Sequence, residues 1–179
     1  MTEAELLTFR IDTPLGELRI AVGPWGVVAV AFPESDWSGD LRRWAAARSA
    51  LQSAAPLPEM AVAAEEAFHR YFSGEVWALE SVPVDLPVSP ATARVLEVVR
   101  RIPPGATRSY SAIAQELGYG RLGPRWVGTA NARNPAPIVV PCHRVVGKDG
   151  ALTGYGGGLE RKRWLLNWER SHLRPESNG

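Results

Sequence analysis

The chain contains a single cysteine, Cys142, whose neighbours could make it a nucleophile. Apolar residues and Pro141 precede it, and His143 and Arg144 follow it. A thiol reacts as thiolate, and an adjacent imidazole and guanidinium could supply the base and the positive field. Neighbouring residues on a regular strand face opposite ways, so an inert, buried cysteine is the alternative. Pro141 cannot donate to a strand ladder, which predicts a break that brings thiol and imidazole to the same side.

A carboxylate that could complete such a site lies near the C-terminus. Glu169 ends the predicted helix Leu159–Glu169 and lies beside its apolar stripe. With His143 as partner it would form a Cys-His-Glu relay, in which the carboxylate orients the imidazole that activates the thiol. An ordinary ion pair with Arg163 or Arg170 is the other interpretation.

Composition argues against metal and cofactor chemistry. One cysteine cannot form an internal disulfide, and three histidines with one cysteine disfavour a zinc cluster. The glycine-rich segment Thr153–Gly158 lacks the spacing of a phosphate-binding loop, so we expect no metal and no cofactor, and rather close backbone approach to a flat ligand. No apolar run reaches the length of a membrane span and the N-terminus lacks a signal-peptide layout, so we expect a cytoplasmic protein.

The formal net charge of +1 hides a division between the two halves. Residues 1–88 carry six Lys/Arg and thirteen Asp/Glu, a net of −7, and residues 89–179 carry fourteen and six, a net of +8. A basic half suggests an anionic partner, nucleic acid first, although a solvated basic surface gives the same count.

The first half has the pattern of an α+β domain. Short extended runs separated by turn-forming residues predict a β-meander, and two amphipathic segments predict helices. The predicted strands are Leu7–Asp12, Glu17–Val22 and Val27–Phe32, and the predicted helices are Asp40–Gln52 and Glu59–Phe72. The proline-rich segment Val82–Pro90 coincides with the change of charge sign, so we place a boundary between domains 1–88 and 89–179.

The second half is predicted to be helical around the cysteine segment. After a helix over Ala91–Ile102, the segments Tyr110–Leu117 and Arg125–Arg133 are separated by a short glycine-bearing loop, which is a helix-turn-helix pattern. Two packed helices joined by a turn are common in helical cores. Here the second helix has arginines near both ends and small Gly128 and Ala130 between them, which favours DNA as the partner.

These residues together resemble a known family, the O6-alkylguanine-DNA alkyltransferases. The resemblance covers the chain from about Ile102 to Glu169 with order and spacing kept, whereas the N-terminal half resembles the family's ribonuclease-H-like domain only in its layout. The matching motifs are Pro141-Cys142-His143-Arg144-Val145, Asn134-Pro135, Arg125-Trp126-Val127-Gly128, Gly154-Tyr155, Gly157-Gly158-Leu159 and Glu169.

The resemblance implies roles for the reacting groups. Cys142 would accept the alkyl group from guanine O6, with O4-alkylthymine as a second candidate substrate. His143 would act as base through a bridging water, and Glu169 would orient His143. Tyr110 would crowd the target phosphate to promote base flipping and would hydrogen-bond the guanine ring. The protein would act once per molecule, because nothing in the sequence suggests how the thioether would be broken.

The resemblance also implies how DNA would be held. Arg125 would enter the duplex from the minor groove and fill the gap left by the flipped base, on a helix whose Trp126, Gly128, Ala130 and Arg133 face the DNA. Asn134 would act as a hinge, and Tyr155 and Gly156 would line the guanine pocket. The carbonyls of Cys142 and Val145 would accept from the exocyclic amine. The expected partner is double-stranded DNA containing alkylated guanine, bound by a monomer.

Two departures from the family pattern affect these expectations. Trp126 stands where a small residue is usual, and the loop before Arg125 is about one residue longer than in familiar members. Gly156 stands where serine or alanine is usual, which predicts a roomier pocket that tolerates alkyl groups larger than methyl.

Three other functions stay open as alternatives. A non-enzymatic binder of alkylated DNA would lack the acceptor cysteine, and a cysteine hydrolase would leave the basic helix-turn-helix without purpose. A transcription factor would need a further regulatory domain, for which the chain has no room.

Overall fold

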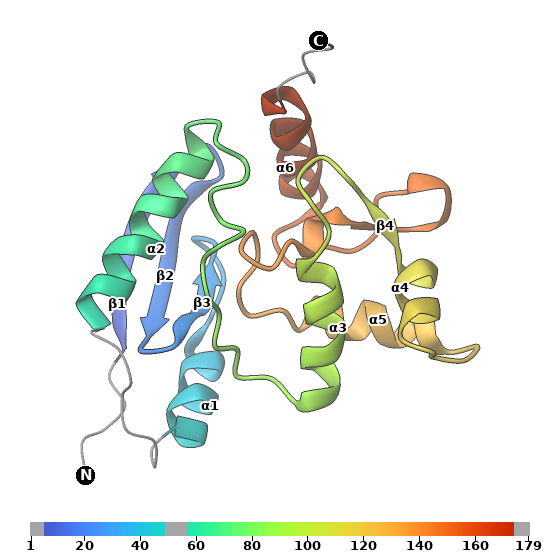
Figure 1. Ribbon diagram of the computed structural model, residues 1–179, viewed down its shortest axis with the longest axis horizontal. Coiled ribbons are helices and arrows are strands. Elements are labelled where there is room, and N and C mark those ends of the chain that lie inside the picture. Colours follow the sequence, from blue (N-terminus) through green and yellow to red (C-terminus); the bar gives the residue numbers. More distant parts are fainter. Residues whose placement is uncertain (1–5, 49–56, 174–179) are drawn as a thin grey trace.

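A three-stranded antiparallel sheet forms the centre of the N-terminal half (Figure 1). The computed structural model describes residues 6–48 and 57–173. Strands β1 (Leu7–Thr13), β2 (Gly16–Gly23) and β3 (Gly26–Ala31) pair in the order of the chain, so the predicted meander is confirmed. Gly16 and Gly26 have φ values of 99° and 142°, which tight turns require and glycine adopts without strain.

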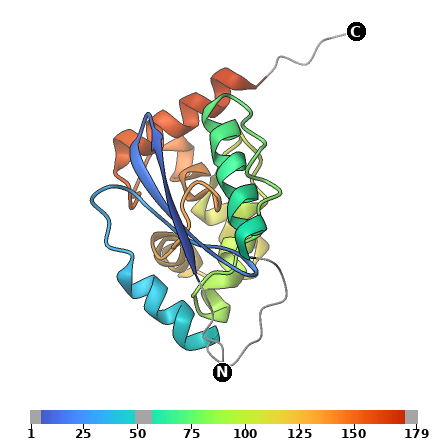
Figure 2. The same ribbon diagram turned by 90° about the vertical axis from the view of Figure 1, so that its left-hand side faces the viewer.

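Helices cover both faces of this sheet (Figure 2). Helix α1 (Ser38–Arg48) packs on β3 through Trp44, and α2 (Leu57–Phe72) packs on β1 and β2. Both helices were predicted; the end expected for the first, residues 49–52, lies outside the described residues. Tyr71 is buried near the end of α2 and reaches toward the C-terminal half.

The C-terminal half is a small helical cluster. Helix α3 (Pro90–Arg100) begins where the hydroxyl of Ser89 accepts a hydrogen bond of 3.2 Å from the backbone N–H of Thr92, with proline at the first helical turn. Helices α4 (Tyr110–Glu116) and α5 (Gly123–Ala132) pack against each other as the predicted helix-turn-helix. Helix α6 (Leu159–His172) extends three residues beyond its predicted end.

The cysteine segment is irregular rather than a strand. The chain makes a short 3-10 turn, Cys142–Arg144, after Pro141, and only then a two-residue strand, β5 (Val145–Val146), parallel to β4 (Arg108–Ser109). The break predicted at Pro141 is therefore present. Because the turn ends the extended run, the thiol and the imidazole are not held on opposite faces of a sheet.

Helix α6 joins the two halves. Leu165 belongs to the core beneath the sheet, and the stacked rings of Trp164 and Trp168 pack against the same core. The helix also contacts the turn that carries Cys142. Among the described residues, no helix has both the length and the apolar character needed to cross a bilayer.

Candidate active site

Cys142 lies at the wall of a cavity of about 220 Å³ between the two halves of the chain. The end of β3 and the loop after it form one wall, the end of α5 forms another, and Tyr155 and Gly156 of the glycine-rich loop form a third. The cysteine is only 5% exposed. The cavity is therefore a route by which a flat ligand could meet the thiol.

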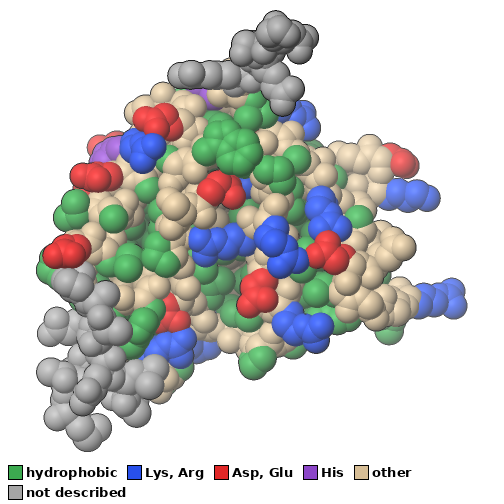
Figure 3. Space-filling view, in the orientation of Figure 1, with side chains coloured by type: hydrophobic (Ala, Val, Ile, Leu, Met, Phe, Trp, Pro, Cys, Tyr) green, Lys and Arg blue, Asp and Glu red, His purple; other side chains and the backbone are tan. Residues whose placement is uncertain are grey.

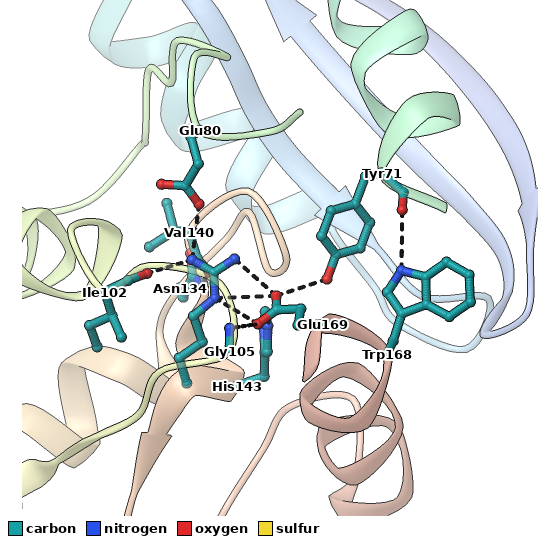
Figure 4. Close-up of polar contacts among 10 residues, drawn as sticks. Tyr71, Glu80, Ile102, Gly105, Asn134, Val140, His143, Trp168 and Glu169 are labelled. Atoms are coloured by element: carbon teal, nitrogen blue, oxygen red, sulfur yellow. Dashed lines mark hydrogen bonds and ion pairs between the residues drawn. The ribbon is translucent and has the colours of Figure 1, made fainter. Parts of the chain in front are cut away.

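His143, the next residue in the chain, is fully buried beside Glu169 (Figure 4). Its Nε2 lies 2.7 Å from Oε1 of Glu169. A carboxylate only accepts, so Nε2 carries the proton and Nδ1 presents a lone pair. This Nδ1 is buried and has no protein partner. The imidazole is thus arranged as a base with one free nitrogen.

Glu169 is the centre of a buried polar cluster. Besides His143, it accepts hydrogen bonds from the Tyr71 hydroxyl at 2.9 Å and the backbone N–H of Gly105 at 3.2 Å. The guanidinium of Arg144 donates through Nε at 3.0 Å and Nη2 at 2.9 Å. Figure 4 shows Tyr71 of α2, Gly105 of the loop after α3 and His143 of the cysteine turn around the carboxylate of Glu169, which α6 carries. An arginine in this geometry holds the carboxylate ionised and fixed in orientation.

Two expectations about charge partners change. Arg144, expected to lend its field to the thiol, points instead to Glu169 and to Glu80, whose Oε1 lies 3.0 Å from Nη1. Arg163, which was one alternative ion-pair partner for Glu169, pairs instead with Glu160 on the exposed side of α6. Glu169 lies on the buried side of α6, where Arg144 reaches it, whereas Arg163 lies on the exposed side of the same helix.

Burial governs the protonation of these groups. It raises the pKa of the Cys142 thiol to about 11, against smaller opposing effects of Asn134 and of the Lys162 charge. It also lowers the pKa of His143 despite the nearby Glu169, so the imidazole is neutral at pH 7. Burial alone would raise the pKa of Glu169, but His143 and Arg144 outweigh it and hold it at about 2. The resting site is a neutral thiol, a neutral imidazole and an ionised carboxylate.

Lys162 holds the glycine-rich loop and was not singled out from the sequence. Its ammonium is buried and donates to the carbonyls of Val145, Thr153 and Gly154 at 2.6, 3.0 and 3.2 Å. The hydroxyl of Tyr110 donates to the same Thr153 carbonyl at 3.2 Å. The sequence signal for Lys162 was its position among the apolar residues of α6. Its partners could not be predicted, because they are backbone carbonyls and every residue type has one.

Two asparagines brace the cysteine segment. Asn134 donates through Nδ2 to the Val140 carbonyl at 2.8 Å and accepts from the Ala136 N–H at 3.1 Å. Its role as a hinge stays a prediction. Asn131, which sequence reasoning missed, donates to the Cys142 carbonyl at 3.3 Å from the inner face of α5. A polar residue within the buried stripe of that helix was the signal for it.

The candidate DNA-facing residues of α5 do not share one environment. Arg125 and Arg133 are exposed near the two ends of the helix, and Gly128 lies beside the Tyr110 ring. Trp126 is half-buried against the C-terminal core and Ala130 is fully buried in it. The helix therefore presents arginines to solvent while Ala130, expected to face DNA, packs inward because it lies on the apolar face.

Basic side chains also mark the neighbouring surface. Figure 3 shows Lys and Arg side chains over the centre of this face, with Asp and Glu side chains between them. Arg101, which follows α3, and Arg108 of β4 are both paired with Glu116 of α4. Within the described residues, no group of three His, Cys, Asp or Glu could hold a metal ion.

Comparison with known proteins relates this arrangement to a family. Residues 90–171 match the family described as 6-O-methylguanine DNA methyltransferase, DNA binding domain. The methylated-DNA-protein-cysteine methyltransferase of Mycobacterium bovis is 37% identical over 161 residues, which cover 90% of each chain.

Solved structures agree with this match. The crystal structure of Mycobacterium tuberculosis O6-methylguanine methyltransferase has a TM-score of 0.74 at 34% identity and covers 96% of this chain and 97% of that one. That of M. tuberculosis OGT in complex with DNA has a TM-score of 0.71 at 35% identity, with 91% and 92% covered. The mixed α/β fold, the site and the sequence agree, and the chain belongs to the methylated-DNA-protein-cysteine methyltransferase family.

Proposed function

We propose that this protein repairs alkylated guanine in double-stranded DNA by transferring the alkyl group from O6 to its own Cys142. The observation that carries the proposal is the buried thiol at a cavity wall, backed by a neutral His143 whose free Nδ1 faces no protein partner. In this family context, the cavity would receive the flipped base, because an enzyme acting on a group in the base stack must first extrude the nucleotide.

The proposed transfer uses side chains of this chain and one bridging water. The thiol proton passes through a bridging water to Nδ1 of His143, while Glu169 and Arg144 keep the imidazole oriented. Sulfur then attacks the alkyl carbon, the S–C bond forms and the C–O6 bond breaks. The electron pair of the C–O6 bond stays on guanine, which takes up at a ring nitrogen the proton that His143 had received, so the imidazole becomes neutral again. Because the thiol pKa is about 11, we expect deprotonation to accompany lesion binding rather than precede it.

The product limits the protein to one turnover. A thioether is stable, and the chain offers no group placed to cleave it, among the described residues around Cys142. The protein therefore acts as a stoichiometric reagent.

The DNA would be held by the helix-turn-helix from the minor groove. Arg125 is exposed at the start of α5, where it would fill the space of the extruded base, and Tyr110 would assist flipping. Arg133 at the other end of α5 would contact phosphate.

Four finer expectations stay part of the proposal. The N-terminal half is a ribonuclease-H-like domain over residues 1–88, followed by a DNA-binding domain over residues 89–179. The protein acts as a monomer, and it works in the cytoplasm. The start of α3 at Pro90 fits the proposed boundary.

The test is intact-protein mass spectrometry after mixing with a short duplex that contains one O6-methylguanine. We expect a gain of about 14 Da on Cys142 that saturates at one per protein, with Cys142→Ala and an undamaged duplex as controls. Selective binding to the damaged duplex without an adduct would indicate a non-enzymatic lesion binder. The absence of both an adduct and selective binding would exclude the repair function.

A further inference from the structure

Unpaired polar atoms are concentrated around the candidate lesion cavity. In the described part of the chain, four buried side-chain nitrogen or oxygen atoms have no hydrogen-bond partner, and three are Asn131 Oδ1, His143 Nδ1 and Tyr155 Oη. Asn131 and Tyr155 line the cavity with Cys142, and His143 follows Cys142 in the chain. Buried polar groups are normally paired, so such a cluster indicates a site that a ligand completes. The proposed reaction uses His143 but leaves Asn131 without a role.

The orientation of the Asn131 amide is fixed by its neighbour. The side chain is 7% exposed, and its Nδ2 donates to the Cys142 carbonyl at 3.3 Å. A carbonyl can only accept, so the NH₂ group must face it and Oδ1 must face the other way. Asn131 therefore keeps an unpaired hydrogen-bond acceptor, Oδ1, in a side chain that lines the cavity, while one N–H of its amide is already used.

The backbone carbonyls near this amide are already engaged. The Cys142 carbonyl accepts from the backbone N–H of Val145 and from Asn131, which occupies both of its lone pairs. The Val145 carbonyl accepts from the Lys162 ammonium at 2.6 Å. These two carbonyls were the expected acceptors for the exocyclic amine of guanine. The Val145 carbonyl keeps a second lone pair, and Oδ1 of Asn131 is a further, unpaired side-chain acceptor on the cavity-lining helix α5.

The chemistry of the lesion determines what such an acceptor can bind. In an O6-alkylguanine the ring nitrogens and O6 accept hydrogen bonds, and the exocyclic amine is the donor on the base. An O4-alkylthymine has no donor at all. We propose that Asn131 is a specificity-determining residue whose Oδ1 accepts a hydrogen bond from the exocyclic amine of the extruded guanine. The proposal rests on the repair function above, and it disfavours O4-alkylthymine because that base leaves Oδ1 unpaired.

The test removes the two partners of this hydrogen bond separately. Single-turnover transfer rates are measured with saturating duplexes that carry O6-methylguanine, O6-methylhypoxanthine, which lacks the exocyclic amine, or O4-methylthymine. The proteins are wild type, Asn131→Leu and Asn131→Ala, and Asn167→Leu makes the same change at an exposed asparagine of α6. Thermal unfolding confirms that each variant folds.

We expect wild type and Asn167→Leu to react with O6-methylguanine at least about tenfold faster than with the other two lesions, because a site built to pair with a group rejects the analogue that lacks it. In both Asn131 variants the guanine-to-hypoxanthine ratio should fall by about tenfold, the size of one lost hydrogen bond in a double-mutant cycle. If Asn131→Leu does not fold, the rate ratio measured for Asn131→Ala tests the proposal.

Two outcomes would overturn the proposal. Asn131 also lies beside the Tyr110 hydroxyl, whose pKa is raised by burial against the opposing effects of hydrogen bonds with Thr153 and Asn131. If Asn131 serves only to position the Tyr110 hydroxyl, the Asn131 variants will lower the transfer rates from all three lesions by the same factor. Equal wild-type transfer rates from O6-methylguanine and O6-methylhypoxanthine would also refute the proposal. This comparison needs no variant. Failure of wild type to transfer from O6-methylguanine would instead refute the repair function.

Discussion

The hydroxyl of Tyr71 donates a hydrogen bond of 2.9 Å to Oε1 of Glu169, the same oxygen that lies 2.7 Å from His143 Nε2. Tyr71 belongs to α2 of the N-terminal half, and Glu169 belongs to the last helix. Arg144 makes a second connection of this kind, to Glu80. The N-terminal half therefore contributes directly to the polar cluster that orients the candidate base.

The Tyr71 contact should matter more for stability than for transfer. In Tyr71→Phe, the buried carboxylate loses one donor but keeps His143 and Arg144, so we expect the free energy of unfolding to fall by about 2 kcal/mol. The transfer rate should stay within about threefold of wild type, whereas Glu169→Gln should lower it by about 100-fold or more because the base loses its orientation. Denaturant titration and single-turnover assays measure the two effects.

Tyr119→Phe is the matched control for the unfolding measurement, because Tyr119 packs against the C-terminal core without a contact to Glu169. Equal changes in unfolding free energy for the two tyrosine variants would contradict a specific role of the Tyr71 hydroxyl.

Stability should fall in acid because of Glu169. Its pKa is about 2 in the folded protein against 4.5 as the ordinary value, so its contribution is complete above pH 4.5 and is lost as the pH falls toward 2. This difference corresponds to about 3 kcal/mol. His143, whose pKa burial lowers, adds a loss that begins below its ordinary value of 6.5, because only the unfolded chain takes up that proton readily.

Urea titrations at pH 7, 5 and 3.5 would measure this dependence. Glu169→Gln should be less stable than wild type at pH 7 but should show a shallower loss between pH 5 and 3.5. Parallel curves for the two proteins would mean that other groups cause the acid sensitivity.

Local sequence patterns predict the elements of this fold well. The apolar spacing of α2 and the Ser89–Pro90 start of α3 are signals confined to a few residues, and each element lies within a few residues of its expected position. The break at Pro141 is equally local, because proline cannot donate to a strand. These features depend on neighbouring residues and are therefore visible in the sequence.

The partners of the buried charges could not be predicted in the same way. His143 and Glu169 were paired in advance, but the contacts of Arg144 with Glu80 and of Tyr71 with Glu169 join residues 64 and 98 positions apart. Nothing in the local pattern selects such a partner. The thiol shows the same limit, because its pKa of about 11 results mainly from burial by segments distant in the chain.

The Lys162 ammonium should fix the glycine-rich loop. In Lys162→Met the carbonyls of Val145, Thr153 and Gly154 lose a charged donor, and hydrogen bonds to charged groups contribute about 1.5–3 kcal/mol. We therefore expect amide hydrogen exchange over residues 153–158 to become at least about tenfold faster. Lys148→Met, at an exposed lysine, should leave it unchanged. Unaltered exchange in the Lys162 variant would show that the loop is held by other contacts.

Gly156 should set the size of alkyl group that the cavity accepts. A Cβ at this position would have no heavy atom within 4 Å, and Gly156 lines the cavity beside Cys142. Its φ lies outside the positive region, so Gly156→Ala should fold normally and raise the free energy of unfolding by up to about 1 kcal/mol. The methyl group would narrow the entrance, and we expect the rate with O6-benzylguanine in DNA to fall at least about tenfold more than the rate with O6-methylguanine.

Gly157→Ala gives the contrast that isolates this effect. A Cβ there would lie 2.5 Å from Cε2 of Phe32 and 2.9 Å from Cε1 of Tyr155, both side chains of the cavity wall. We expect this variant to lose about 1–3 kcal/mol of stability through overpacking and to slow transfer of both alkyl groups similarly. If only Gly156→Ala slows transfer of benzyl more than transfer of methyl, the result would support the conclusion that glycine at position 156 makes the pocket roomier. Equal losses for methyl and benzyl in that variant would show that the pocket edge does not limit alkyl size.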